Sequence, residues 1–137
     1  MKQKSILFTP TLNSTFFVVA STLDEFGFCA ALNETLGITL RIAPSVNEST
    51  EHNLYTGNNE LSHVQVDVLV NKALRSVCVD FLENIDYIIR VNNISTESEV
   101  YNFQEQLLRI GQCVFVQKLD LSKFTAKQAK QLVHLFV

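Results

Sequence analysis

The sequence predicts an α+β domain, a two-layer sandwich in which a mostly antiparallel sheet carries helices on one face. Short apolar runs, several of them alternating with polar residues, predict strands. Three segments begin at a Thr with Glu or Gln three residues later and continue with apolar residues at helical spacing, which predicts helices. The expected order is strand, helix, strand, loop, three strands, helix, strand and helix.

The whole chain, residues 1–137, is expected to form a single domain. With 137 residues, of which 47% are hydrophobic, it can bury a core without disulfides or metals. Glycine (4 residues) and proline (2 residues) are too scarce for a low-complexity chain.

The first half begins with an apolar strand at residues 16–20, after a possible edge strand at residues 5–8. A helix is expected over residues 21–37, with Thr22 and Glu25 as its capping box and Gly37 at its end. Its expected buried stripe consists of Phe26, Cys29, Ala30, Leu32 and Leu36.

A half-buried strand is expected next, over residues 38–43, with Ile38, Leu40 and Ile42 facing the core. The polar stretch 45–62 reads as a long loop that Leu54 and Tyr55 could anchor as a short strand.

The middle of the chain predicts three consecutive strands. Residues 63–70 alternate, so the four valines should face inward while Gln65 and Asp67 face outward. Residues 77–81 and 85–91 should form the next two strands, joined by a short acidic turn.

The last third predicts a helix over residues 96–110, with a Thr96–Glu99 capping box and Gly111 at its end. A strand over residues 113–119 should follow. Residues 125–136 should form a third helix, capped by Thr125 and Gln128.

Two strand–helix–strand halves bracketing a strand meander favour a ferredoxin-like or ACT-like arrangement. Strands at residues 16–20 and 88–89 look apolar on both sides, so the second face of the sheet must also be covered. The third helix, the long loop or a second subunit could cover it. The absence of a linker and the excess of apolar residues favour a homodimer.

The composition also restricts the partners. Eleven Lys and Arg against 14 Asp and Glu give a net charge of −3, with no basic patch for nucleic acid. The apolar runs are far shorter than the roughly 18 residues that cross a bilayer. Polar residues interrupt the apolar stretch near the N-terminus, so we expect no secretory signal, no membrane association and a cytoplasmic protein.

Neither a cofactor nor a metal is expected. The three cysteines, Cys29, Cys78 and Cys113, lie in apolar surroundings without CxxC spacing, as buried thiols of a reducing compartment do. Four glycines cannot form a glycine-rich phosphate loop.

The acids Asp80, Glu83 and Asp86 are the sharpest candidate cluster. Close carboxylates can divide acid and base roles or bind a divalent cation. The alternative is that they cap a turn and face solvent. Three further residues are candidates for binding a ligand or partner: Asn33 on the first helix, Tyr55 and His63.

Residues of this region and of the first helix are similar to a known protein family. Residues 85–89, Ile-Asp-Tyr-Ile-Ile, and the pattern Leu32-Asn33 followed by Leu36-Gly37 resemble the uncharacterised bacterial IPExxxVDY family. Val79-Asp80-Phe81 stands where that family has its Ile-Pro-Glu end, so this part of the motif is absent. The resemblance spans roughly residues 16–120 and implies an α+β fold without an assigned activity.

The function expected from these features is binding rather than catalysis: self-association or binding of another protein, with a small ligand at a dimer interface as a further option. The alternative is a small metal-dependent or acid–base enzyme that uses the Asp80, Glu83 and Asp86 cluster.

Overall fold

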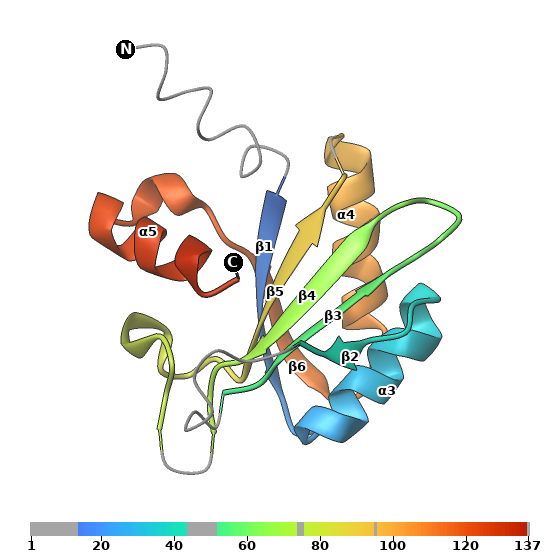
Figure 1. Cartoon of the computed structure of the whole chain (residues 1–137), viewed down its shortest axis with the longest axis horizontal. Helices are drawn as coiled ribbons and strands as arrows, with labels where there is room; N and C mark the ends of the chain where they lie inside the picture. The colour runs from blue at the N-terminus through green and yellow to red at the C-terminus, as the bar shows by residue number, and fades with distance from the viewer. Residues whose placement is uncertain (1–13, 44–51, 74–75, 95, 137) are drawn as a thin grey trace.

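The computed structural model describes residues 14–43, 52–73, 76–94 and 96–136. Within them, six strands form one sheet in the order β2-β3-β4-β5-β1-β6, and each neighbouring pair is antiparallel (Figure 1). The predicted α+β class and antiparallel sheet are therefore confirmed. The strands are β1 (Ser14–Ser21), β2 (Arg41–Ile42), β3 (Leu54–Asn58), β4 (Gln65–Val70), β5 (Tyr87–Asn92) and β6 (Cys113–Lys118).

Three α-helices and two 3₁₀ helices accompany the sheet in the described residues. No helix in this part of the chain is both long and apolar enough to cross a membrane. The helices are α3 (Glu25–Leu36), α4 (Glu97–Leu108), α5 (Ala126–His134), η1 (Asp80–Leu82) and η2 (Leu121–Lys123).

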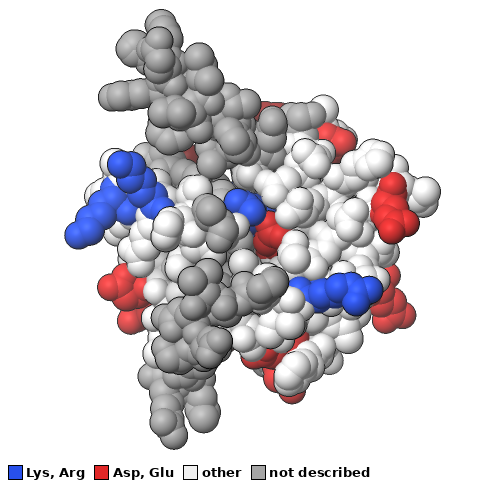
Figure 2. Space-filling model, viewed as in Figure 1, with Lys and Arg blue, Asp and Glu red and all other residues white. Residues whose placement is uncertain are grey.

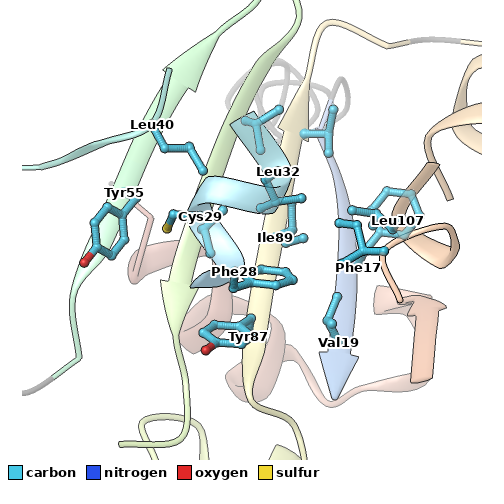
Figure 3. Packing of buried hydrophobic residues seen from close by; sticks show 14 of the residues in the cluster. Phe17, Val19, Phe28, Cys29, Leu32, Leu40, Tyr55, Tyr87, Ile89 and Leu107 are labelled. Atoms are coloured by element: carbon cyan, nitrogen blue, oxygen red, sulfur yellow. The ribbon is translucent and has the colours of Figure 1, made fainter. Parts of the chain in front are cut away.

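Strand β1 divides two cores because its side chains alternate between the faces of the sheet. Phe17 and Val19 point into the larger core under α3 and α4, which Figure 3 shows from close by. There Phe28 of α3 stacks on Tyr87 of β5, with ring centroids 4.2 Å apart. Phe17 stacks on Phe103 of α4 at 5.3 Å, so both helices are anchored to the sheet by aromatic pairs.

The second face of the sheet carries a smaller core under α5, which lies on the opposite side from α3 and α4 (Figure 1). Phe16 and Val18 of β1 share this cluster with Leu132 of α5 and with Phe136, which follows the end of α5. Helix α5, the third predicted helix, therefore covers part of the second face, which is one of the three options that the sequence left open. Charged side chains on the described part of this face are spread out, with uncharged atoms between most of them (Figure 2).

Helix α3 begins later than the sequence predicted. Its N-cap is Asp24, whose Oδ1 accepts a hydrogen bond of 2.8 Å from the Gly27 amide, so the Thr22–Glu25 capping box was wrong. The buried residues of α3 are Phe28, Cys29 and Leu32, of which Cys29 and Leu32 belonged to the predicted stripe. Phe26, expected in the buried stripe, is 73% exposed.

The end of α3 was predicted correctly: Gly37 takes a φ of 67° and its amide donates to the carbonyl of Asn33. The strand expected over residues 38–43 is reduced to Arg41–Ile42, and Ile42 is exposed. The cause is local, because the Asn33 Oδ1 accepts from the Leu40 amide at 2.8 Å and holds that segment against the helix end. A Cβ at Gly57 of β3 would lie 2.6 Å from the Thr39 carbonyl oxygen, so only glycine permits this close approach.

The strand expected over residues 77–81 was wrong. Val77 forms only an isolated bridge with Lys72, and η1 follows. The fully buried Asn71 explains this, because its side chain binds the backbone of the returning segment. Its Nδ2 donates to the carbonyls of Leu82 and Ile85 at 2.9 and 2.8 Å, and its Oδ1 accepts from the Val79 amide at 2.8 Å.

Asp67 does not face solvent as the alternation of β4 suggested. It is 3% exposed, and its Oδ2 accepts from Nε and Nη2 of Arg90 on β5 at 3.0 and 2.9 Å. The same Nη2 donates to the carbonyl of Phe136 at 3.0 Å, and the guanidinium carbon lies 5.4 Å from the Phe136 ring centroid. Both faces of β4 are covered, so a polar residue on the second face is buried and paired.

The two C-terminal capping boxes are confirmed. Thr96 and Glu99 cap α4, and Thr125 and Gln128 cap α5, each pair with reciprocal hydrogen bonds. Gly111 does not end α4, since Arg109 is its C-cap. The predicted short strand at Leu54 and Tyr55 is also confirmed as the start of β3. The edge strand expected at residues 5–8 lies outside the described residues.

Candidate functional site

The three acids of the predicted cluster occupy different environments. Asp80 and Glu83 are exposed at the beginning and end of η1. Asp86 is half-buried, and its Oδ2 accepts from the Ser21 amide at 2.9 Å, which ties the start of β5 to the end of β1. Within the described residues, no group of three His, Cys, Asp or Glu side chains is arranged to hold a metal ion. The enzyme alternative stays a prediction without a site geometry to support it.

Two other candidates have visible structural roles. Asn33 holds the Leu40 amide, as described above. His63 is exposed in the turn between β3 and β4, at a left-handed φ of 63°, and its carbonyl accepts from Asn93 Nδ2 at 2.9 Å. Asn93 itself has a φ of 73°, so two unusual backbone conformations support each other at this end of the sheet.

Tyr55 belongs to a polar cluster that the sequence did not reveal. Its hydroxyl donates to Oε2 of Glu25, and the same oxygen accepts from Asn53 Nδ2 at 2.8 Å. Burial, followed by the hydrogen bond to Glu25, raises the pKa of the Tyr55 hydroxyl above its usual value. The cluster joins the first turn of α3 to β3, and Tyr55 remains a proton donor at neutral pH.

Cys29 and Tyr87 lie in the same core, and their ionisation is also suppressed. Burial, with the Glu25 carboxylate adding to it, raises the pKa of the Cys29 thiol from 9.0 to about 12. Burial also raises the pKa of the Tyr87 hydroxyl, which donates to the Leu23 carbonyl at 2.6 Å. Since a thiol must ionise to act as a nucleophile, Cys29 is a packing residue at neutral pH.

Strand β6 forms one outer edge of the sheet, and this edge is a candidate binding surface. The Leu119 amide donates to the Phe16 carbonyl at 2.8 Å. Peptide groups alternate in direction along an antiparallel strand, so those of Val116 and Lys118 point away from β1. No described strand pairs with this side of β6, because β6 is the last strand of the sheet. Its outward backbone donors and acceptors are a template for another strand.

Exposed apolar side chains lie on β6 itself and on α4, the helix that contacts it. Four of the seven exposed large hydrophobic residues in the described chain lie on β6 and α4: Tyr101, Leu108, Val114 and Phe115. Val114 is 71% exposed, although it stands on a strand of six residues. We call Val114, Phe115, Val116 and Lys118, together with Tyr101 and Leu108, the β6 edge surface.

The opposite edge of the sheet is formed by a much shorter strand. Strand β2 has only two residues, of which Arg41 is exposed. Short strands and charged side chains are the usual devices that prevent an edge from pairing with another chain. Strand β6 has six residues, and its one charged side chain, Lys118, stands at its last position. The β6 edge surface is therefore the better candidate for an interface.

Comparison with known proteins adds no identity. No protein-family model matches the chain, and no curated protein matches it. The resemblance to the IPExxxVDY family stays a prediction that rests on residues 85–89 and on the end of α3.

Proposed function

We propose that this α+β domain acts by binding, and that it associates with a second copy of itself through the β6 edge surface. The supporting observation is the six-residue outer strand that carries exposed apolar side chains and outward peptide groups. Two such edges related by a two-fold axis pair as antiparallel strands and join two sheets into one.

The side chains favour one register for this pairing. A two-fold axis through Val116 sets Val114 opposite the partner's Lys118 and Phe115 opposite the partner's Gln117. The two copies of Lys118 are then four positions apart, roughly 13 Å along the strands, which is more than a Debye length at physiological salt. A register centred on Lys118 instead places like charges together, which destabilises a strand pair.

Helix α4 supports the same interface. Gln106 lines a pocket with Leu36 of α3 and Val66 of β4, so this side of α4 faces away from β6. Two positions along a helix correspond to a rotation of about 200°. Leu108 therefore lies on the opposite side of α4, toward the β6 edge, where it can pack against a partner and add apolar burial.

The proposal is tested by measuring molar mass against concentration, by sedimentation equilibrium of the full chain. We expect a dimer that dissociates on dilution. Val114→Lys should weaken the dimer at least tenfold, because the new lysine stands opposite the partner's Lys118. Adding Lys118→Glu to Val114→Lys should restore it, because each pair then has opposite charges.

Ile42→Lys is the matched control, since Ile42 is an exposed apolar residue on the other edge of the sheet. It should leave the dimer unchanged, while circular dichroism verifies that every variant is folded. A monomer at all concentrations up to roughly 100 μM, or a dimer that Val114→Lys and Ile42→Lys weaken equally, would contradict the proposal.

We also propose that the fold is a variant of the ferredoxin-like or ACT-like arrangement. The support is that β5 and β6 flank β1 and are both antiparallel to it, with α4 as the connection between them. Such a split strand–helix–strand unit is the building block of those folds.

A further inference from the structure

An open polar hollow lies on the second face of the sheet, beside the β2 edge. It has a volume of about 500 Å³ and is lined by residues of β2, β3 and β4 and by residues next to these strands and next to β5. Every described residue that lines it carries a polar side chain, with the exception of Gly57. A ligand for this hollow must therefore be strongly polar, because the lining offers no apolar wall against which an apolar group could be buried.

The register of the sheet brings three of the lining side chains together. Arg41 of β2 is directly opposite Thr56 of β3, and Thr56 is directly opposite Asp67 of β4. Residues that are directly opposite each other in an antiparallel pair point to the same face, with Cβ atoms about 5 Å apart. The Asp67 side chain lies on the second face with Arg90, so Arg41 and Thr56 point to that face too. Asn58 is two positions after Thr56 and therefore shares the face, which makes these three side chains neighbours above one small area of the sheet.

No described residue occupies the donors of Arg41, Thr56 and Asn58. Their side chains form neither a hydrogen bond nor an ion pair within that part of the chain. Asp67, in contrast, is already paired, because its Oδ2 accepts from Nε and Nη2 of Arg90 at 3.0 and 2.9 Å. Among the described residues that line the hollow, Arg41 is the one with a permanent charge, so the hollow is electropositive.

We infer that this hollow binds small carboxylates that carry several hydroxyl groups. The Arg41 guanidinium donates two parallel hydrogen bonds to a carboxylate, and the single charges of the two groups match. A phosphate monoester carries close to two negative charges and meets one permanent cation here, so it is the poorer fit. The hydroxyl groups bond to Thr56 and Asn58, whose side chains both donate and accept. This inference does not depend on the proposed dimer, because β2 and β6 are the opposite ends of the sheet.

The first experiment compares matched probes by two-dimensional NMR of the full chain at constant low ionic strength. D-gluconate contains both groups, sorbitol lacks the carboxylate, 1-amino-1-deoxysorbitol has an ammonium in its place, and hexanoate lacks the hydroxyl groups. We expect gluconate to bind with a Kd on the order of 1 mM and to shift the Arg41 Nε–H signal. Sorbitol and hexanoate should each bind roughly fivefold more weakly or worse, and the ammonium probe should cause no saturable shift. Equal or tighter binding of any other probe, or no saturable shift with gluconate, would overturn the inference.

The second experiment removes the Arg41 charge without changing the fold. Arg41 is exposed, so Arg41→Gln should stay folded, and it should bind gluconate about tenfold more weakly than wild type does. Arg109→Gln is the matched control, because Arg109 is an exposed arginine at the end of α4 that does not line the hollow. If both variants weaken gluconate equally, the attraction is a nonspecific charge effect and the site is wrong.

Two further variants test the surroundings of Arg41. Thr56→Val keeps the shape of the side chain and removes its hydroxyl, so it should weaken gluconate about threefold and leave hexanoate unchanged. Glu60 borders an adjoining hollow that Arg41 also lines, so Glu60→Gln should remove a repulsive charge and strengthen gluconate about twofold. Equal weakening of gluconate and hexanoate by Thr56→Val would contradict the assignment of the hydroxyl groups to this side chain.

Discussion

The two faces of the sheet are stabilised by different means. Under α3 and α4, a large apolar cluster packs two helices of 12 residues each against the sheet. Under α5, the cluster is smaller, and the short elements around it are held by hydrogen bonds of buried polar side chains. The two buried polar residues in the described chain, Asp67 and Asn71, both bind backbone or side chains that belong to this second face.

This difference matters because apolar burial is not directional, whereas hydrogen bonds are. The first face tolerates some rearrangement as long as its volume is filled. The second face depends on a few specific groups, and each leaves a buried donor, acceptor or charge unsatisfied when its partner is removed. Substitutions on the two faces should therefore differ in size and in how far their effects spread.

The largest effect is expected at the centre of the first face. Phe28→Ala should lower the free energy of unfolding by about 4 kcal/mol, because it removes a fully buried ring that stacks on Tyr87 and leaves a cavity. Urea denaturation measures this loss. The neighbouring Phe26→Ala removes an exposed ring and should change stability by no more than about 0.5 kcal/mol. Similar losses for the two variants would mean that the helix face has been misassigned.

The second face should respond most strongly at its ion pair. Asp67→Ala should cost about 3 kcal/mol, because it leaves the Arg90 guanidinium largely buried without its carboxylate. The double variant Asp67→Val with Arg90→Met should cost less than Asp67→Ala alone, because no charge is then left unpaired. Urea denaturation gives both values. A double variant that loses as much as Asp67→Val and Arg90→Met do in sum would mean that the two side chains are not energetically coupled, which contradicts the prediction.

The polar anchor of the segment between β4 and β5 should have the next largest effect. Asn71→Ala should cost about 2.5 kcal/mol, since it removes the Asn71 hydrogen bonds to the Ile85 carbonyl and the Val79 amide, and one of the two bonds that the Leu82 carbonyl accepts. The variant should accelerate the exchange of amide hydrogens, relative to wild type, more within residues 76–86 than in α4. Asn84→Ala, at an exposed position of the same segment, should have almost no effect. Uniformly faster exchange over the whole chain would argue that Asn71 is not a local anchor.

These examples show which parts of the structure can be predicted from the sequence. The Thr96 and Thr125 capping boxes and the Gly37 helix end were found because their partners lie within one turn of the chain. The alternation of β4 located the strand correctly but misplaced Asp67, because alternation predicts an exposed face only when one side of the sheet is open to water. Here α5 and its neighbours cover the second side.

Two of the other errors share one physical cause, which is a contact made by a side chain outside the predicted element. Asn71 binds the backbone of residues 79–85 and prevents the strand that their apolar composition favours. Glu25 was assigned to a capping box, yet its carboxylate binds Tyr55, which is 30 positions away. No local pattern marks such pairs, so the candidate site could be predicted only in part. The β6 edge shows the same limit, because the sequence predicted the strand but not its place at the end of the sheet.

A smaller effect is expected when the pH dependence of stability is compared between a buried thiol of the first face and a thiol of the second. Burial raises the pKa of the Cys29 thiol from 9.0 in the solvent-exposed, unfolded chain to about 12 in the fold, so its contribution to stability is complete below pH 9 and is lost as the pH rises from 9 to 12. Between pH 8 and 10.5, wild type should lose about 2 kcal/mol more than Cys29→Ala. Urea denaturation at both pH values measures the difference. Cys78→Ala, which replaces a half-buried thiol of the second face, should change the slope less.

The smallest predicted effect compares two equivalent caps on opposite faces. Thr96→Ala and Thr125→Ala each remove a side-chain acceptor at a helix start, so each should cost the helix about 1 kcal/mol. Helix α4 is anchored by Phe103 and Leu107 in the large core, so its loss should appear as lower global stability in urea.

Helix α5 has nine residues and one fully buried side chain, Leu132, so it can open while the rest of the sheet stays folded. Thr125→Ala should therefore speed hydrogen exchange in α5 about fivefold and change global stability by less than Thr96→Ala does. Equal global losses would show that α5 unfolds only together with the sheet, and that the second face is as cooperative as the first despite its polar construction.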